Sequence, residues 1–104
     1  YSVPGVLKNA IDFASRPYGD NPFTDKPVAI MSASPGMLGG ARAQYHLRQI
    51  FVFLNMHPLN GPEVIVTFAQ NKFDSNGNLT DENTRNFLKQ LLQNLAHWTR
   101  RLRE

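Results

Sequence analysis

The stretch Val28-Ala-Ile-Met-Ser-Ala-Ser-Pro-Gly-Met-Leu-Gly-Gly-Ala41 decides the fold of this 104-residue chain. Its first four residues, 28–31, are all apolar and lack period-2 alternation, which indicates a strand buried on both faces, as in a parallel α/β sheet. The small residues and glycines that follow predict a tight turn leading directly into a helix. Because ligands of open parallel sheets bind beyond the carboxyl ends of the strands, this loop is the predicted ligand site. Its candidate residues are Ser32, Ser34 and Gly36.

Composition predicts one small globular domain and excludes several kinds of site. Hydrophobic residues make up 41% of the chain, which is enough for a core. The chain contains no cysteine, so disulfides, thiolate metal sites and cysteine nucleophiles are excluded. No apolar run is long enough to span a membrane, and no signal peptide is visible, so we expect a cytoplasmic protein. The net charge of +3 is concentrated in arginines near the end of the last predicted helix, where it complements the helix dipole, and a nucleic-acid partner is not expected.

The region before the central strand predicts a helix and a connection. Apolar residues at helical spacing indicate a helix over residues 4–15, with Pro4 in its first turn and Ser2 as its candidate N-cap. Its first turn is either a capped helix end packed on the sheet or a place where a polar ligand binds. Residues 16–25 are rich in turn formers and predict a surface connection.

The region after the loop predicts a helix, a broken strand and a long final helix. Residues 39–54 carry apolar side chains at core spacing, and residues 56–68 read as a strand interrupted by prolines. The segment 74–80 fails the calcium-loop pattern and predicts a polar turn. Thr80 is the predicted cap of the last helix. Phe87 and Trp98 flank the predicted core stripe of this helix, and for Trp98 a core role is favoured over a cofactor contact. The stripe itself consists of Leu88, Leu91, Leu92, Leu95, Thr99 and Leu102.

Two stretches resemble the NADPH-dependent FMN reductase family, which includes quinone, azo-dye and chromate reductases. Ser-Ala-Ser-Pro-Gly-Met-Leu-Gly-Gly-Ala-Arg-Ala-Gln-Tyr-His-Leu-Arg-Gln (32–49) resembles its second flavin-contacting loop and the following helix. Tyr-Ser-Val-Pro-Gly-Val-Leu-Lys-Asn-Ala-Ile-Asp (1–12) resembles the segment after its third strand. The resemblance implies an α/β fold: the C-terminal portion of a flavodoxin-like doubly wound parallel sheet of order 2-1-3-4-5. Residues 1–104 would supply strands 4 and 5 with three helices, without strands 1–3 and the Gly-Ser-x-Arg-x-x-Ser phosphate loop.

The resemblance also implies an activity. FMN would carry two electrons from NADPH or NADH to a quinone, an azo compound, a flavin or an oxidised metal ion, without a side chain acting as acid or base. Backbone groups of Ala33, Ser34 and Gly36 would contact the pyrimidine edge of the flavin, and Tyr1 and Ser2 would line its other side. Ser32 completes the set of expected cofactor-binding residues.

Subunit contacts are expected on the helix over residues 39–54. Arg42 and Tyr45 are neighbours on the helix surface and predict a site for a carboxylate from another subunit, the alternative being a solvated face. Glu63 is the candidate carboxylate partner of Arg42, in a homodimer or homotetramer. Since two strands rarely form a stable sheet, we expect a separate segment or a second copy to complete it.

Two other functions remain open at this point. A flavodoxin-like structural or assembly module without flavin is the alternative to an enzyme, and nucleotide binding without redox chemistry is a third hypothesis. The three histidines lack metal-binding spacing, so no metal site is predicted.

Overall fold

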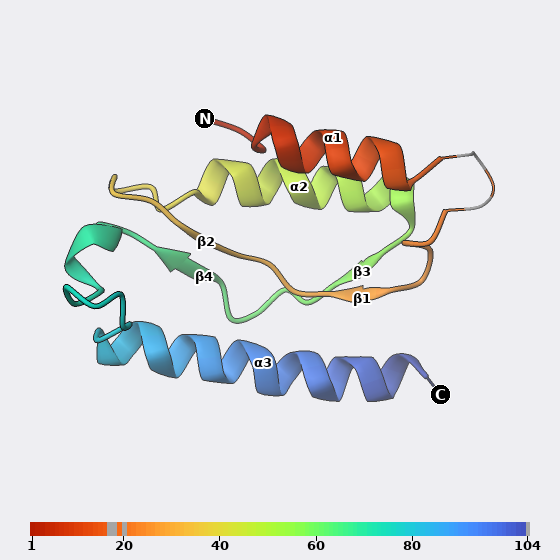
Figure 1. The fold of residues 1–104 in the computed structure, drawn as a ribbon. Coiled ribbons are helices and arrows are strands. Elements are labelled where there is room, and N and C mark those ends of the chain that lie inside the picture. The colour runs from red at the N-terminus through yellow and green to blue at the C-terminus, as the bar shows by residue number, and fades with distance from the viewer. Residues whose placement is uncertain (17–18, 20, 104) are drawn as a thin grey trace.

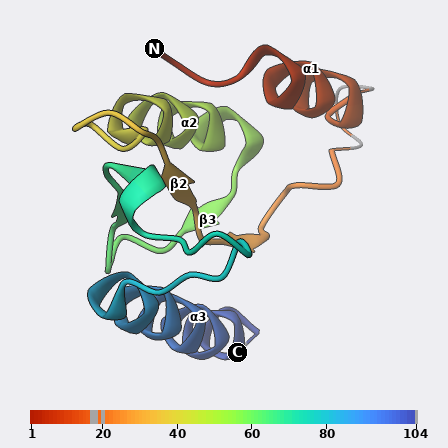
Figure 2. The ribbon, with the colours of Figure 1, turned by 60° about the vertical axis from the view of Figure 1, so that its left-hand side comes forward.

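The computed structural model describes residues 1–16, 19 and 21–103, arranged in three layers. Figure 1 shows α1 and α2 on one side of the strands and α3 on the other, and the turned view in Figure 2 shows the same layering. The elements in chain order are α1 (Gly5–Ala14), β1 (Pro27–Val28), β2 (Met31–Ala33), α2 (Ala41–Leu54), β3 (His57–Pro58), β4 (Val64–Val66), the 3-10 helix η1 (Ala69–Asn71) and α3 (Glu82–Leu102).

All four described strands pair in parallel, which confirms the predicted α/β class. β1 pairs with β3, with Pro27 opposite His57, and β2 pairs with β4, with Met31 opposite Val64. Each of the two predicted strands is therefore present as two short pieces. The break falls at the same level in both, because residues 59–63 between β3 and β4 lie opposite residues 29–30 between β1 and β2.

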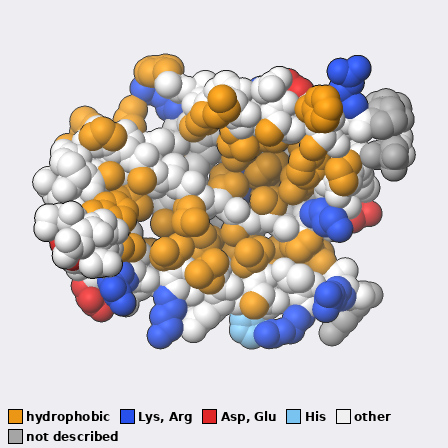
Figure 3. Space-filling model, viewed as in Figure 1, with side chains coloured by type: hydrophobic (Ala, Val, Ile, Leu, Met, Phe, Trp, Pro, Cys, Tyr) orange, Lys and Arg blue, Asp and Glu red, His pale blue; other side chains and the backbone are white. Residues whose placement is uncertain are grey.

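The core lies on both sides of these strands, but one strand edge is open. The buried hydrophobic residues are Ile11, Phe51, Leu54, Val64 and Leu91. The prediction that residues 28–31 are buried on both faces is wrong for this chain: the side chain of Met31 is 60% exposed. In the part of the chain that the structure describes, β2 has a strand neighbour on one side only. Figure 3 shows hydrophobic side chains gathered on the face between α1 and α3, where a further strand would cover apolar surface.

Both predicted helix N-caps are wrong, because the N-cap residues lie one or two positions further along the chain. The N-cap of α1 is Pro4, without a side-chain hydrogen bond, because the hydroxyl of Ser2 contacts His46 instead. The N-cap of α3 is Asp81, whose carboxylate accepts from the backbone N–H of Thr84 (3.0 Å). Hydrogen bonds from the hydroxyl and the backbone N–H of Thr84 lower the pKa of Asp81 below its usual range.

Only part of the predicted stripe of α3 is buried. Leu91 is fully buried, whereas Phe87 and Leu92 are each 55% exposed. Trp98 is half-buried, and its indole N–H donates to the carbonyl of His57 (2.8 Å), so it is a packing residue as predicted. None of the described helices is long and apolar enough to cross a membrane.

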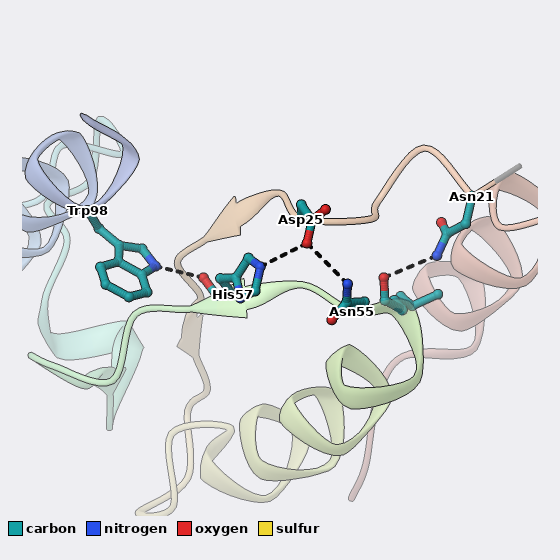
Figure 4. A network of polar contacts seen from close by, with 6 residues as sticks. Asn21, Asp25, Asn55, His57 and Trp98 are labelled. Carbon is teal, nitrogen blue, oxygen red and sulfur yellow. Dashed lines mark hydrogen bonds and ion pairs between the residues drawn. The ribbon is translucent and has the colours of Figure 1, made fainter. Parts of the chain in front are cut away.

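A network of side chains ties the start of β1 to the start of β3 (Figure 4). The carboxylate of Asp25 contacts the His57 ring and the Asn55 side-chain amide, each at 3.1 Å. Asn21 donates to the carbonyl of Leu54 at the end of α2 (3.2 Å). Residues 21–25 form the predicted turn, while residues 17, 18 and 20 of the predicted connection lie outside the described residues.

Candidate functional site

The loop that follows β2 is held against the segment that follows β4. The N–H of Ser34 donates to the carbonyl of Val66, and the carbonyl of Ser34 accepts from the N–H of Ala69, both at 3.0 Å. The carbonyl of Gly36 accepts from the N–H of Phe68 (3.1 Å). The carboxyl ends of both strands therefore meet at one edge of the molecule, which is where ligands of parallel sheets bind.

Two glycines let this loop approach the strands closely. Gly39 and Gly40 have φ angles of +60° and +88°, in the left-handed region that favours glycine. A Cβ on Gly39 would lie 2.6 Å from Cγ2 of Ile65, and a Cβ on Gly40 would lie 2.7 Å from Cβ of Ser32. The predicted tight turn is thus confirmed, and side chains at these two positions would push the loop off the strands.

A buried glutamine that the sequence did not single out fixes the same loop from α2. Gln44 is only 2% exposed, and its side-chain amide donates to Oγ of Ser32 (2.7 Å) and to the carbonyl of Val64 (2.9 Å). Oγ of Ser32 donates in turn to the carbonyl of Gly39 (2.6 Å). Ser32 is therefore engaged within the protein. The available signal was a polar residue three positions before Leu47, on the core-facing side of the helix.

Two adjoining hollows of about 380 Å³ each lie between the N-terminal segment, the loop and the start of α2. They share Ser2, and every predicted cofactor-binding residue lines one or both of them. The first hollow is lined by Tyr1, Ser2, Ser34 and Gly36, and the second by Ser2, Ser32 and Ala33. Segments about thirty residues apart in sequence thus line the same hollows, and their role in cofactor binding stays a prediction.

The three predicted backbone donors differ in what they contact. The N–H of Ser34 belongs to the contact with Val66, and the N–H of Gly36 donates to Oγ of Ser34 (3.2 Å). Successive residues of a strand direct their backbone groups to opposite sides, and both groups of Ser34 face β4. Those of Ala33 consequently face the open edge of β2, which makes Ala33 the best oriented of the three.

The predicted subunit-contact residues interact within the chain, and Arg42 also lines the first hollow. The Arg42 guanidinium lies over the Tyr1 ring, 4.1 Å from its centroid. The hydroxyl of Tyr45 donates to the Glu63 carboxylate (2.9 Å), and this hydrogen bond raises the pKa of Tyr45 above its usual range. Within the chain, the predicted partner of Arg42 is therefore bound to Tyr45 instead, while contacts between subunits stay a prediction.

The sequence matches a known family and several curated relatives. Residues 1–71 match the family described as NADPH-dependent FMN reductase. The chain is 59% identical over 103 residues to an NAD(P)H-dependent FMN reductase of Pseudomonas aeruginosa, covering 99% of this chain and 55% of the relative. It is 52% identical over 104 residues to an NADPH:quinone oxidoreductase of Arabidopsis thaliana, covering 98% of this chain and 52% of the relative.

The fold also matches a solved structure. FerB, a flavoenzyme NAD(P)H:(acceptor) oxidoreductase from Paracoccus denitrificans, superposes with a TM-score of 0.84 at 35% identity, covering 96% of this chain and 55% of that chain. This agreement confirms the expected flavodoxin-like topology. The chain spans about half the length of the curated relatives it matches.

Proposed function

The chain belongs to the NADPH-dependent FMN reductase family, and we propose that the whole protein reduces quinones with NADPH or NADH through bound FMN. The observation that carries this proposal is the first hollow, in which the two segments with family resemblance meet. The names of the curated relatives favour quinones as acceptors. We extend the proposed acceptors to azo compounds, flavins and oxidised metal ions, because a ring bound at an open hollow is accessible to varied partners.

The residues of the site fit the ring of a flavin. Ligand pockets are typically about 300–1,000 Å³, so a hollow of about 380 Å³ suits a ring system rather than a whole nucleotide. Ser34 and Gly36 are small enough for a planar group to approach the backbone, and the Tyr1 side chain is 93% exposed beside them. When bound, FMN supplies the two-electron carrier between the nicotinamide and the quinone. In this proposal the ring reaches from the first hollow into the second, where the backbone of Ala33 holds its polar edge; Ser34 and Gly36 lie beside it, and Tyr1 and Ser2 line its other side.

The open edge of β2 supports a proposal about the rest of the domain. We propose that a strand supplied outside residues 1–104, or by a second copy, pairs with β2 and covers Met31. The phosphate of FMN would be held by that part of the protein, since the phosphate motif of the family has no counterpart in this sequence. A cytoplasmic location remains a prediction.

Flavin binding by the protein that contains the complete domain tests the function. We expect quenching of flavin fluorescence on titration with FMN, and NADPH oxidation that yields one quinol per NADPH. A folded protein without flavin affinity would support the structural or assembly module instead. Affinity for adenine nucleotides without flavin binding would support the third hypothesis.

A homodimer or homotetramer through α2 is the second part of the proposal. Arg42 has an aromatic ring rather than a carboxylate as its neighbour in the chain, which leaves its charge for an acidic partner on another subunit. Glu63→Gln should reduce the mass measured by light scattering, while Glu82→Gln, which removes an exposed carboxylate from α3, serves as the control for loss of a negative charge. An unchanged mass in Glu63→Gln would exclude Glu63 from the interface.

A further inference from the structure

Ser2 and His46 form a hydrogen-bonded pair that the proposed function does not yet use. Oγ of Ser2 lies 2.5 Å from Nδ1 of His46, although the residues are 44 positions apart in sequence. Ser2 precedes α1, and His46 lies in the second turn of α2. Both side chains are exposed, so the contact links a residue of the candidate site to a titratable group in contact with solvent.

The pair connects the candidate site to a neighbouring hollow. Ser2 lines both hollows of the candidate site and also a third hollow of about 380 Å³, in which His46 lies. His46 does not line the first two hollows. A ring bound in the first hollow would therefore have Ser2 beside it and His46 behind Ser2, on the side that stays open to solvent.

The reaction requires a proton that the nicotinamide does not supply. Quinone reduction follows quinone + NAD(P)H + H⁺ → quinol + NAD(P)⁺, in which the hydride brings two electrons and one proton. We propose, resting on the proposed function, that His46 and Ser2 relay the second proton to a quinone oxygen. Starting from the imidazolium, His46 passes its Nδ1 proton to Oγ of Ser2 as the hydroxyl of Ser2 gives its own proton to the quinone oxygen, and the neutral imidazole then takes up a proton from solvent. Histidine suits this role because it exchanges protons near neutral pH.

The charged surroundings of His46 come from two helices. Lys8 of α1 lines the same hollow and is paired with Asp12 (2.8 Å). On α2, Arg42 lies one turn before His46, and Tyr45 precedes it directly. Among these groups His46 is the one in hydrogen-bond contact with Ser2, so it is the group placed to pass a proton to that hydroxyl.

The test compares two electron acceptors in the complete flavin-loaded protein. Benzoquinone takes up protons as it is reduced, whereas ferricyanide takes up an electron and no proton. We expect His46→Gln and Ser2→Ala to slow reoxidation of the reduced protein by benzoquinone about tenfold to a hundredfold and to flatten its pH dependence. In His46→Gln, which lines neither hollow of the candidate site, ferricyanide reoxidation, reduction by NADPH and the FMN dissociation constant should be unchanged. His97→Gln, an exposed histidine on α3, is the matched control.

A further readout does not depend on turnover. The ¹⁵N shifts of the His46 ring should reveal a hydrogen-bonded Nδ1 in the wild type and lose that signature in Ser2→Ala. In His46→Gln, equal slowing with both acceptors, or weakened FMN binding, would show that the pair only clamps the N-terminal segment to α2. Unchanged benzoquinone rates would also overturn the relay. A wild-type protein that neither binds FMN nor oxidises NADPH would overturn the proposed function and the relay with it.

Discussion

Replacing Gln44 by methionine should leave the free energy of unfolding nearly unchanged, although this glutamine is buried and makes two hydrogen bonds. The substitution removes its donations to Ser32 and Val64, each with a net contribution of about 0.5–1.5 kcal/mol. It also removes Oε1, a buried acceptor without a partner among the described residues, whose burial costs about 1–3 kcal/mol. Methionine has a similar volume, so no cavity forms. The terms offset one another to within about 1 kcal/mol.

Gln44→Glu has the same shape and should behave differently. It places a carboxylate oxygen against the carbonyl of Val64, where Nε2 of the glutamine now donates at 2.9 Å. Burying that charge costs several kcal/mol at neutral pH. Burial raises the folded-state pKa of such a glutamate above its unfolded value of about 4.3, so the loss should be small below that pH, where the group is protonated in both states. The loss should then grow as the pH rises.

Urea unfolding of both variants at about pH 4 and about pH 7 measures these differences. Gln49→Met, at an exposed position of the same helix, is the control for the substitution itself. A loss above about 2 kcal/mol in Gln44→Met would show that Oε1 has a partner in solution, such as a buried water, and would refute the reasoning. Wild-type stability of Gln44→Glu at neutral pH would show that this position is not dry.

Three further substitutions test the loop, the last helix and the strand network. Gly40→Ala should weaken FMN binding in a fluorescence titration, because its Cβ would lie 2.7 Å from Ser32 at a left-handed φ; unchanged affinity would mean that the loop relaxes freely. Asp81→Ala should lower the melting temperature at pH 7 but not well below pH 3.9, since the stabilisation from a lowered pKa is present above the unfolded value and lost as pH falls through the folded one. Trp98→Phe should cost about 0.5–1.5 kcal/mol in urea unfolding through the lost hydrogen bond to His57, and a neutral result would assign Trp98 to packing alone.

The strands show how much of the fold could be predicted from local sequence patterns. An apolar run and a proline break were enough to predict two parallel strands with helices on both sides. The break at residues 29–30 was not predicted, because a strand pairing is a property of two segments and an interruption in one removes the partner of the other. The exposure of Met31 is equally non-local, since it depends on which strand lies on the far side of β2.

The candidate site shows which contacts could not be predicted from local sequence patterns. Small residues and glycines predicted the tight loop, and the resemblance brought Tyr1 and Ser2 to it. The sequence predicted that Ser2 would cap α1, whereas its hydroxyl contacts His46, a choice that depends on tertiary packing. Gln44 was missed for a related reason: one polar residue on an apolar helix face reads as an interruption until its acceptors are known.

The two ends of the sheet are held by different residues. Substitutions that affect only stability can therefore be told apart from those that also affect flavin binding. At the carboxyl ends, backbone contacts and the close approach of Gly39 and Gly40 hold the loop, so substitutions there should alter the shape of the hollows as well as stability. At the opposite end, the backbone N–H of Asp25 donates to the carbonyl of Asn55 (2.7 Å), and the Asp25 carboxylate contacts the side chains of Asn55 and His57, which lie on the segment leaving α2. Because this network lines neither hollow of the candidate site, its substitutions should reduce stability while leaving flavin affinity intact in the fraction that is folded. Measuring both quantities in one set of variants would therefore distinguish residues that shape the site from those that hold the sheet together.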